Sequence, residues 1–329
     1  MVVMASSEHI KALLLSHMER DEERFLSVAL QVAAHEARSG HGKLAQELRD
    51  IVEKARKQSK VGNAVSIAKG LKDSSGLLYA TTPKLRLSDL IAPPEVKDRL
   101  QRVIREQRHM AKLKNHGLSP RRKLLLVGPP GTGKTFTASI LAGELGYPLF
   151  QVRLDALITK FMGETSAKLR QVFDAVDDVR GVYFFDEFDA LGSQRTAPND
   201  VGEARRILNS FLQMIEQDES NSLIVCASNH EEILDHALFR RFDDVVRYRL
   251  PGPAEILTLF EGRLTQYVRG DFPWNQLSAL ADGLSSAEIT LVAQDAIKDL
   301  LIDEREEITL PLLEEAIADR RGMAHDLST

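Results

Sequence analysis

The stretch GPPGTGKT, Gly128 to Thr135, follows the apolar run KLLLV and precedes the helical stretch TFTASILAGELG. It matches the pattern G-x-x-x-x-G-K-[ST], in which glycines let backbone N–H groups surround phosphates at the start of a helix. Lys134 can reach the β and γ phosphates of a nucleotide, and Thr135 can bind Mg²⁺. The sequence therefore predicts ATP and Mg²⁺ as cofactors. The loop residues predicted to hold the nucleotide are Gly128, Pro129, Pro130, Gly131, Thr132, Gly133, Lys134, Thr135 and Phe136.

Short apolar runs alternate with helical stretches on both sides of this loop. The runs PLFQVRL, VYFF and LIVCAS are separated by TSAKLRQVFDAV and EARRILNSFLQMIEQ. Such alternation predicts an α/β fold in which helices cover both faces of a parallel sheet. Beyond Pro251 only helical patterns follow. We therefore predict a large α/β subdomain at 85–250 and a small helical subdomain at 251–329.

The region before the α/β part has a different texture. Residues 1–57 carry helical periodicity and predict a three-helix module, whose middle helix is DEERFLSVALQVAAHEAR. We interpret this module as a binding site for a client or a partner. The stretch 58–84 has scattered Gly, Ser and Thr and few bulky residues, which predicts a linker or a lightly ordered arm.

Composition excludes several classes of protein. The net charge of -5 gives no overall electrostatic argument for nucleic acid or an anionic membrane as the main partner. The single cysteine, Cys226, excludes a disulfide framework and, within LIVCAS, predicts a buried thiol. Neither a secretory leader nor a membrane-spanning apolar run is present in the sequence. These features predict a cytoplasmic protein.

Polar residues at the ends of two predicted strands complete a candidate site for hydrolysis. In VYFFDE, Asp186 is placed to hold Mg²⁺ through water, and Glu187 can polarise the water that attacks the γ-phosphate. In LIVCASN, Asn229 can orient that water or contact the γ-phosphate. Arg240 and Arg241, in LFRRFDD, can stabilise charge on a phosphate bound to a neighbouring subunit. Taken alone, this arginine pair would be interpreted as an ordinary surface feature.

The order and spacing of these motifs, from about Leu87 to Arg321, resemble the AAA+ ATPase family. The resemblance is to the clade that includes protein unfoldases and the katanin- and spastin-like disassembly ATPases. It implies that GPPGTGKT is the Walker A motif, VYFFDE the Walker B motif, and Asn229 the sensor 1 residue. It also implies that Arg240 and Arg241 are arginine fingers, which function only in an oligomer, usually a hexamer. The adjacent arginines depart from the common R-P-G-R-F-D, and which of them contacts phosphate is left open.

The same resemblance implies further contacts. The segment GLSSAEI is similar to one that places Gly283 and Ala287 near the nucleotide, and Leu90 and Ile91 are expected beside the base. The segment KFMGET is similar to the first pore loop. There Lys160, Phe161, Met162 and Gly163 would project into a central channel, where an aromatic ring grips a chain of any sequence. The alternative is that Phe161 packs in the core and supports the helix that follows.

The resulting hypothesis is an ATPase that threads, unfolds or remodels proteins through a central pore, as an unfoldase or chaperone. Feeding a separately encoded protease is one form of this function. The alternative is a nucleic-acid-dependent motor or loader, because residues 97–123 contain ten Lys or Arg and two acidic residues. A third reading, a scaffold that binds ATP and barely hydrolyses it, conflicts with the presence of Asp186, Glu187 and Asn229.

Overall fold

The computed structural model describes residues 22–38, 41–42, 45–46, 48–50, 52, 76–157, 162–191, 200–231 and 236–326. The chain divides into two compact units, Met1–Lys72 and Asp73–Thr329. In the first unit, helix α2 (Glu22–Arg38) occupies the segment predicted for the middle helix. The buried Glu36 carboxylate lies 2.9 Å from Nδ1 of His41, just beyond the end of α2. The other two predicted helices fall mostly outside the described residues.

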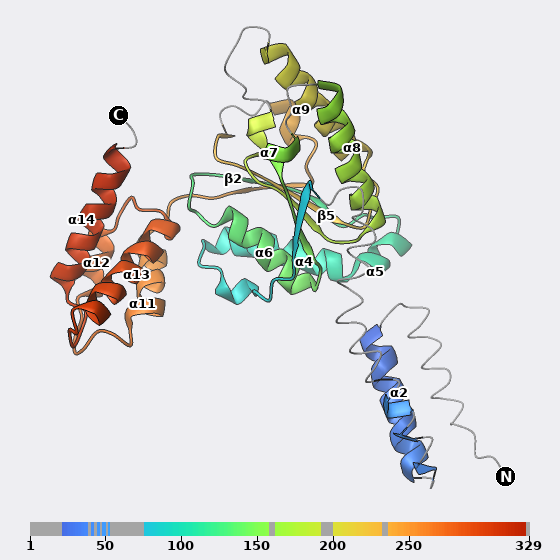
Figure 1. Cartoon of the computed structure of the whole chain (residues 1–329), viewed down its shortest axis with the longest axis horizontal. Coiled ribbons are helices and arrows are strands. Elements are labelled where there is room, and N and C mark those ends of the chain that lie inside the picture. Colours follow the sequence, from blue (N-terminus) through green and yellow to red (C-terminus); the bar gives the residue numbers. More distant parts are fainter. Residues whose placement is uncertain are drawn as a thin grey trace. The chain divides into compact units, whose positions relative to one another are not determined.

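The second unit is built on a six-stranded sheet with the order β1-β3-β4-β5-β2-β6 (Figure 1). The strands are β1 (Leu78–Thr81), β2 (Lys123–Val127), β3 (Leu149–Val152), β4 (Val182–Phe185), β5 (Leu223–Ser228) and β6 (Asp244–Arg247). All neighbouring pairs are parallel except β1 and β3. The four strands predicted from the apolar runs, β2, β3, β4 and β5, are therefore confirmed, and so is the α/β fold class.

Strand β1 corrects the prediction that 58–84 is a linker. Leu78–Thr81 pairs antiparallel with β3, and Leu78 lies opposite Val152. Leu77 and Leu78 are buried, whereas Tyr79 is 62% exposed. A four-residue strand at a sheet edge is held mainly by pairing with its neighbour and by packing. The composition of residues 58–84 does not reveal the pairing with β3, and for this reason the strand was predicted as part of a linker.

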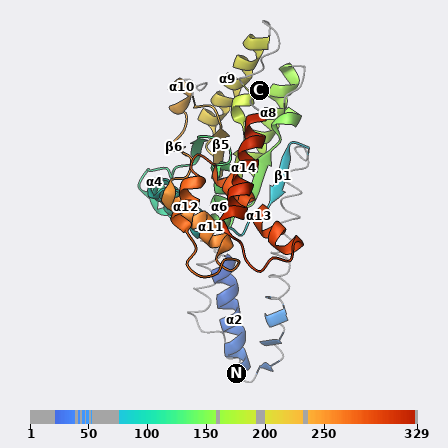
Figure 2. The same cartoon turned by 90° about the vertical axis from the view of Figure 1, so that its left-hand side faces the viewer.

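Helices cover both faces of the sheet (Figures 1 and 2). One layer contains α4 (Pro94–Arg108), α5 (Met110–Asn115) and α6 (Lys134–Leu145), and the other contains α7 (Leu154–Leu157), α8 (Met162–Asp178) and α9 (Asp200–Gln217). Alternate strand residues serve the two layers: Val182 and Phe184 join the core beneath α4 and α6, whereas Phe185 stacks on Phe173 of α8. Because both faces are buried, the functional groups of this sheet lie at the ends of its strands.

The four C-terminal helices form a separate bundle with its own apolar core (Figure 1). They are α11 (Pro253–Leu264), α12 (Trp274–Leu280), α13 (Ser286–Ile302) and α14 (Leu310–Asp326). Ser285 caps α13 by accepting the Glu288 N–H, while the Glu288 carboxylate accepts the Ser285 N–H at 2.7 Å. This capping box fixes the start of α13 at Ser286. Across the described parts of the chain, no helix combines the length and hydropathy needed to cross a membrane.

Candidate functional site

The phosphate loop turns from β2 into α6 through backbone conformations that require glycine. Gly128 has φ +145° and Gly131 has φ +73°. A Cβ on Gly128 would overlap the backbone carbonyl of Tyr248, and a Cβ on Gly131 would lie 2.5 Å from Oγ of Ser285. Both the torsion angles and the close neighbours therefore exclude larger residues here.

We expect Gly128→Ala to lower nucleotide affinity by at least about tenfold and to reduce thermal stability, because the loop must move away from Tyr248. Gly117→Ala is the matched control: Gly117 has φ +70°, but a Cβ there meets nothing within 4 Å. The control should cost only about 1–2 kcal/mol of stability and leave nucleotide affinity unchanged. Calorimetric titration with ATP and a melting curve measure both quantities. Equal losses of nucleotide affinity in the two variants would show that the effect comes from the positive φ and not from the contact with Tyr248.

Lys134 lies where the loop meets the first turn of α6. Its Nζ donates to the carbonyl oxygens of Gly128 at 2.6 Å and Pro129 at 2.8 Å. Burial lowers the pKa of the Lys134 ammonium, while the carboxylates of Asp186, Asp189 and Glu187 act in the opposite direction. The side chain thus sits inside the loop with its donors available for exchange onto phosphate oxygens.

The acidic residues at the end of β4 face the start of α6. Oγ1 of Thr135 donates to Oδ2 of Asp186 at 2.9 Å. A hydroxyl and a carboxylate in contact are the oxygen ligands that Mg²⁺ prefers in nucleotide sites, so these residues fit the ion. Glu187 is exposed and has φ +50°, an uncommon conformation for a residue other than glycine that often occurs at functional sites.

The strand order brings these groups together. Because β4, β5 and β2 are neighbours and parallel, Phe185, Ser228 and Val127 end at the same side of the sheet, which we call the carboxyl edge. A cavity of about 470 Å³ opens there, within the range of nucleotide-sized pockets. It is lined by Asp89, Leu90, Ile91, Pro130, Gly131, Thr132, Gly133, Lys134, Thr135, Phe136, Asp186, Glu187, Asn229, Leu259, Arg263, Ser286, Ala287 and Thr290.

The helical bundle closes one side of this cavity. The backbone N–H of Ala287, in the first turn of α13, donates to the carbonyl of Gly131 at 3.0 Å. Ser286 lines the cavity beside Ala287, whereas Gly283 does not. The phosphate loop and the bundle are therefore joined directly, so a nucleotide in the cavity touches both parts.

Several cavity residues were missed in the sequence. Leu259 and Arg263 lie four residues apart on α11, and Nη2 of Arg263 donates to Oγ1 of Thr290 on α13 at 3.3 Å. Their spacing of four residues places both side chains on one face of the helix. No motif surrounds them in the sequence, so this spacing alone does not identify a binding site.

The remaining predicted residues lie elsewhere. Arg240 and Arg241 follow α10 (His236–Phe239) and do not line the cavity. Lys160 and Phe161 lie outside the described residues. Met162 and Gly163 form the start of α8, and the structure describes only their backbone.

Comparison with known proteins identifies the family. The model of the "ATPase family associated with various cellular activities (AAA)" matches residues 124–250. An "Uncharacterized AAA family ATPase y4kL" from Sinorhizobium fredii is 34% identical over 307 residues, which cover 93% of this chain and 92% of that protein. The chain belongs to the AAA family of ATPases. The phosphate loop and the acidic end of β4 both lie within the residues that the family model matches.

Other AAA relatives share only part of their length with this chain. The "ATP-dependent zinc metalloprotease FtsH" of Helicobacter felis is 29% identical over 282 residues, 82% of this chain and 43% of that protein. FtsH 4 of Sphaerobacter thermophilus is 33% identical over 66% of this chain and 34% of its own length. The chain therefore spans less than half of these two metalloproteases.

A solved structure shows the same fold. The crystal structure of the FIGL-1 AAA domain superposes with a TM-score of 0.60 at 23% identity, covering 77% of this chain and 88% of that one.

Proposed function

We propose that the chain is an AAA motor that hydrolyses ATP in a ring of identical copies, a hexamer by resemblance, and threads, unfolds or remodels proteins through the central pore. The observation that supports hydrolysis most strongly is the single cavity that holds Lys134, Thr135, Asp186, Glu187 and Asn229. We propose further that residues 1–57 select the client or a partner, and that a separately encoded protease is a possible recipient of unfolded chains.

Each group in the cavity has a role in the proposed hydrolysis. Thr135 and Asp186 would hold Mg²⁺, which would neutralise negative charge on the transferring phosphate. Lys134 would exchange its two loop carbonyls for phosphate oxygens. Glu187 would accept a proton from the attacking water, and Asn229 would orient that water. Arg263, Leu259 and Thr290 would contact the nucleotide from the helical bundle.

The basic segment at 97–123 supports this proposal over a nucleic-acid motor. Seven of its ten basic side chains make contacts within the chain: Arg99, Arg102, Arg108, Lys114, Arg121, Arg122 and Lys123. Among the described residues, Lys97, Arg105 and Lys112 alone of the ten have side chains without such a contact. A groove for nucleic acid needs cations free to meet phosphates, and here most of them are already engaged.

The test of the proposal is the steady-state ATPase rate with and without an unfolded protein or single-stranded DNA. We expect the unfolded protein to raise the rate and DNA to leave it unchanged. In Phe161→Ala the ratio of protein-stimulated to basal rate should fall to about one, because the ring that grips the chain is gone. Phe161→Tyr, which keeps an aromatic ring, is the control and should retain stimulation. Stimulation by DNA alone, equal in wild type and Phe161→Ala, would support the nucleic-acid motor instead.

A further inference from the structure

The phosphate loop rests on Tyr248, the residue that follows strand β6. The register of β2 and β6 pairs Val127 with Arg247, and the N–H of Tyr248 donates to the carbonyl of Val127 at 2.7 Å. Tyr248 therefore lies beside Gly128, and for this reason a Cβ on Gly128 would meet the Tyr248 carbonyl. Tyr248 is only 6% exposed and belongs to the core beneath α4 and α6.

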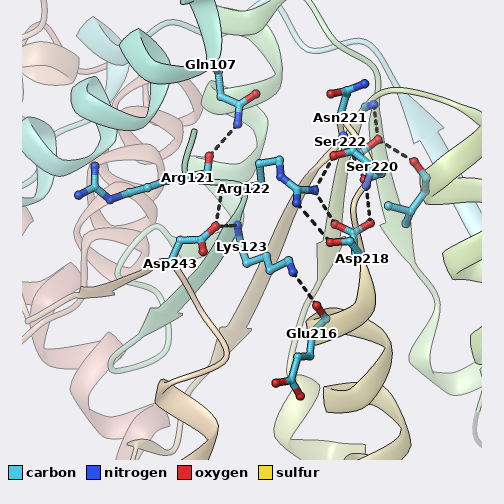
Figure 3. Close-up of polar contacts among 12 residues, drawn as sticks. Gln107, Arg121, Arg122, Lys123, Glu216, Asp218, Ser220, Asn221, Ser222 and Asp243 are labelled. Atoms are coloured by element: carbon cyan, nitrogen blue, oxygen red, sulfur yellow. Dashed lines mark hydrogen bonds and ion pairs between the residues drawn. The ribbon is translucent and has the colours of Figure 1, made fainter. Parts of the chain in front are cut away.

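The other end of β6 is fixed at the opposite side of the sheet (Figure 3). There the Asp243 carboxylate accepts the N–H groups of Arg122 and Lys123, at 2.7 and 2.9 Å. The N–H of Asp243 donates in turn to the carbonyl of Lys123 at 2.8 Å. Asp243 directly precedes β6, and Lys123 begins β2. These three hydrogen bonds fix the register of the two strands, so they also bring Tyr248 to the start of the phosphate loop.

Two hydroxyl groups connect Tyr248 to the other end of the loop. The Tyr248 hydroxyl lies 2.6 Å from Oγ1 of Thr137, a fully buried residue of α6. Oγ1 of Thr137 also lies 3.0 Å from the carbonyl oxygen of Gly133. A carbonyl oxygen only accepts, so the Thr137 hydroxyl donates to Gly133 and accepts from Tyr248. Burial raises the pKa of the Tyr248 hydroxyl, which therefore keeps its proton and remains a donor at neutral pH.

The acceptor at the end of this hydroxyl pair is the last peptide unit of the loop. Gly133 is the N-cap of α6, and its carbonyl belongs to the same planar unit as the N–H of Lys134. In a trans peptide the carbonyl and the N–H point in opposite directions. The first N–H groups of a helix lack a partner within it and bind anions. A hydrogen bond to the Gly133 carbonyl therefore orients the Lys134 N–H and, by polarising the peptide, makes it a stronger donor.

We propose that Tyr248 is a positioning residue for the nucleotide, because through Thr137 it orients and strengthens the Lys134 backbone N–H that binds phosphate. The inference deepens the proposed function and rests on it for the presence of a nucleotide in the cavity. Among the described residues that line the cavity, neither Tyr248 nor Thr137 occurs. A loss of affinity in their variants is therefore an effect transmitted through the peptide unit and not the loss of a direct contact.

The first test is the affinity for ADP, measured by calorimetric titration, of variants that lose one hydroxyl group. Tyr248→Phe and Thr137→Val should each bind ADP about 3- to 30-fold more weakly, the range expected when one hydrogen bond to phosphate is weakened. Thr137→Ser keeps the hydroxyl and should retain the wild-type affinity. The N–H of Thr137 also donates to the Gly133 carbonyl, at 2.9 Å, and this bond remains in every variant. The first turn of α6 is therefore preserved.

The double variant Tyr248→Phe with Thr137→Val separates positioning from stability. Each single variant leaves one buried hydroxyl without its partner, which should lower the melting temperature. In the double variant both hydroxyls are absent and apolar groups of similar shape meet, so the melting temperature should return close to that of the wild type. Its ADP affinity should stay as low as in the single variants. Recovery of the affinity together with the melting temperature would show that the pair only stabilises the fold, and the proposal would be wrong.

Tyr183→Phe is the matched control. The Tyr183 hydroxyl is also buried and donates to the carbonyls of Ala175 and Val179, at 2.6 and 2.8 Å, away from the phosphate loop. Its loss should lower the melting temperature and leave ADP affinity unchanged. If Tyr183→Phe loses as much affinity as Tyr248→Phe, the loss reflects general destabilisation and contradicts the proposal.

Steady-state kinetics of Tyr248→Phe distinguish this inference from the proposed function. The Lys134 N–H binds phosphate both before and during hydrolysis, so KM for ATP should rise while kcat stays within about twofold of the wild type. A fall in kcat at unchanged KM would place the effect on the chemical step and overturn the proposal. If the wild-type chain hydrolyses no ATP but Tyr248→Phe still loses ADP affinity, the proposed hydrolysis is wrong and the positioning role stands.

Discussion

Glu187→Gln should lower the rate of ATP hydrolysis by a factor of about 10²–10⁴ while leaving ATP binding within about threefold of the wild type. The amide has the shape of the carboxylate but cannot accept the proton of the attacking water. Glu187 is exposed in the cavity and its backbone has φ +50°. Glutamine and glutamate tolerate that torsion angle equally, so the substitution changes the chemistry and not the backbone. Single-turnover hydrolysis and calorimetric titration measure the two quantities.

Glu306→Gln is the control, because Glu306 is 82% exposed and pairs only with Arg269 among the described residues. It should hydrolyse ATP at the wild-type rate. Hydrolysis unchanged in Glu187→Gln would remove Glu187 as the base. A loss of ATP binding that matches the loss of rate would show that the carboxylate serves the architecture of the cavity and not the chemical step.

Arg122→Ala should destabilise the α/β subdomain by about 3–5 kcal/mol, the typical cost of leaving one buried charge without its partner. The Arg122 side chain is 14% exposed and Asp218 is 1% exposed. Arg122 also donates to the backbone carbonyls of Ser220 and Asp218, at 2.5 and 3.2 Å, so it closes the turn between α9 and β5. The melting temperature should fall by roughly 6–20 °C, given about 2–4 °C per kcal/mol for a domain of this size.

Arg102→Ala is the matched control in the same basic segment. Its pair with Glu106 is one helical turn away and the arginine is 63% exposed, so the loss should be about 0.3–0.5 kcal/mol. The double variant Arg122→Met with Asp218→Leu should recover much of the stability, because apolar residues of similar volume replace the pair. If Arg122→Ala and Arg102→Ala have the same melting temperature, another group compensates the charge of the buried Asp218 carboxylate.

The carboxyl edge of the sheet could be predicted from the sequence because each of its groups directly follows a strand. Asp186 and Asn229 come after apolar runs, and parallel strands end together, so the pattern alone brings them to the phosphate loop. The spacing in GPPGTGKT adds the turn itself. At these positions the local sequence pattern and the arrangement of the strands lead to the same site, so the site residues can be predicted from the sequence.

Contacts between distant segments could not be predicted in the same way. β1 forms by pairing across about 70 residues with β3, and Arg263 reaches the cavity only because α11 packs against α13. The basic segment is the clearest case. A run of positive charge in the sequence indicates an interaction surface, yet in the fold Arg99 pairs with Asp244 and Arg122 pairs with Asp218, which are both more than 90 residues away.

The position of Arg240 and Arg241 gives the proposed ring a direction. The two arginines precede β6, at the amino ends of the parallel strands, whereas the nucleotide cavity lies at their carboxyl ends, so contact between copies in that ring would be head-to-tail and not a two-fold symmetric dimer. An open row of such copies always contains one cavity without an incoming arginine and one arginine without a target. Only closure gives every cavity its donor. In two copies fused in tandem, ATP would therefore be hydrolysed in one cavity and not in the other. A substitution placed in one half of the fusion would inactivate a chosen cavity.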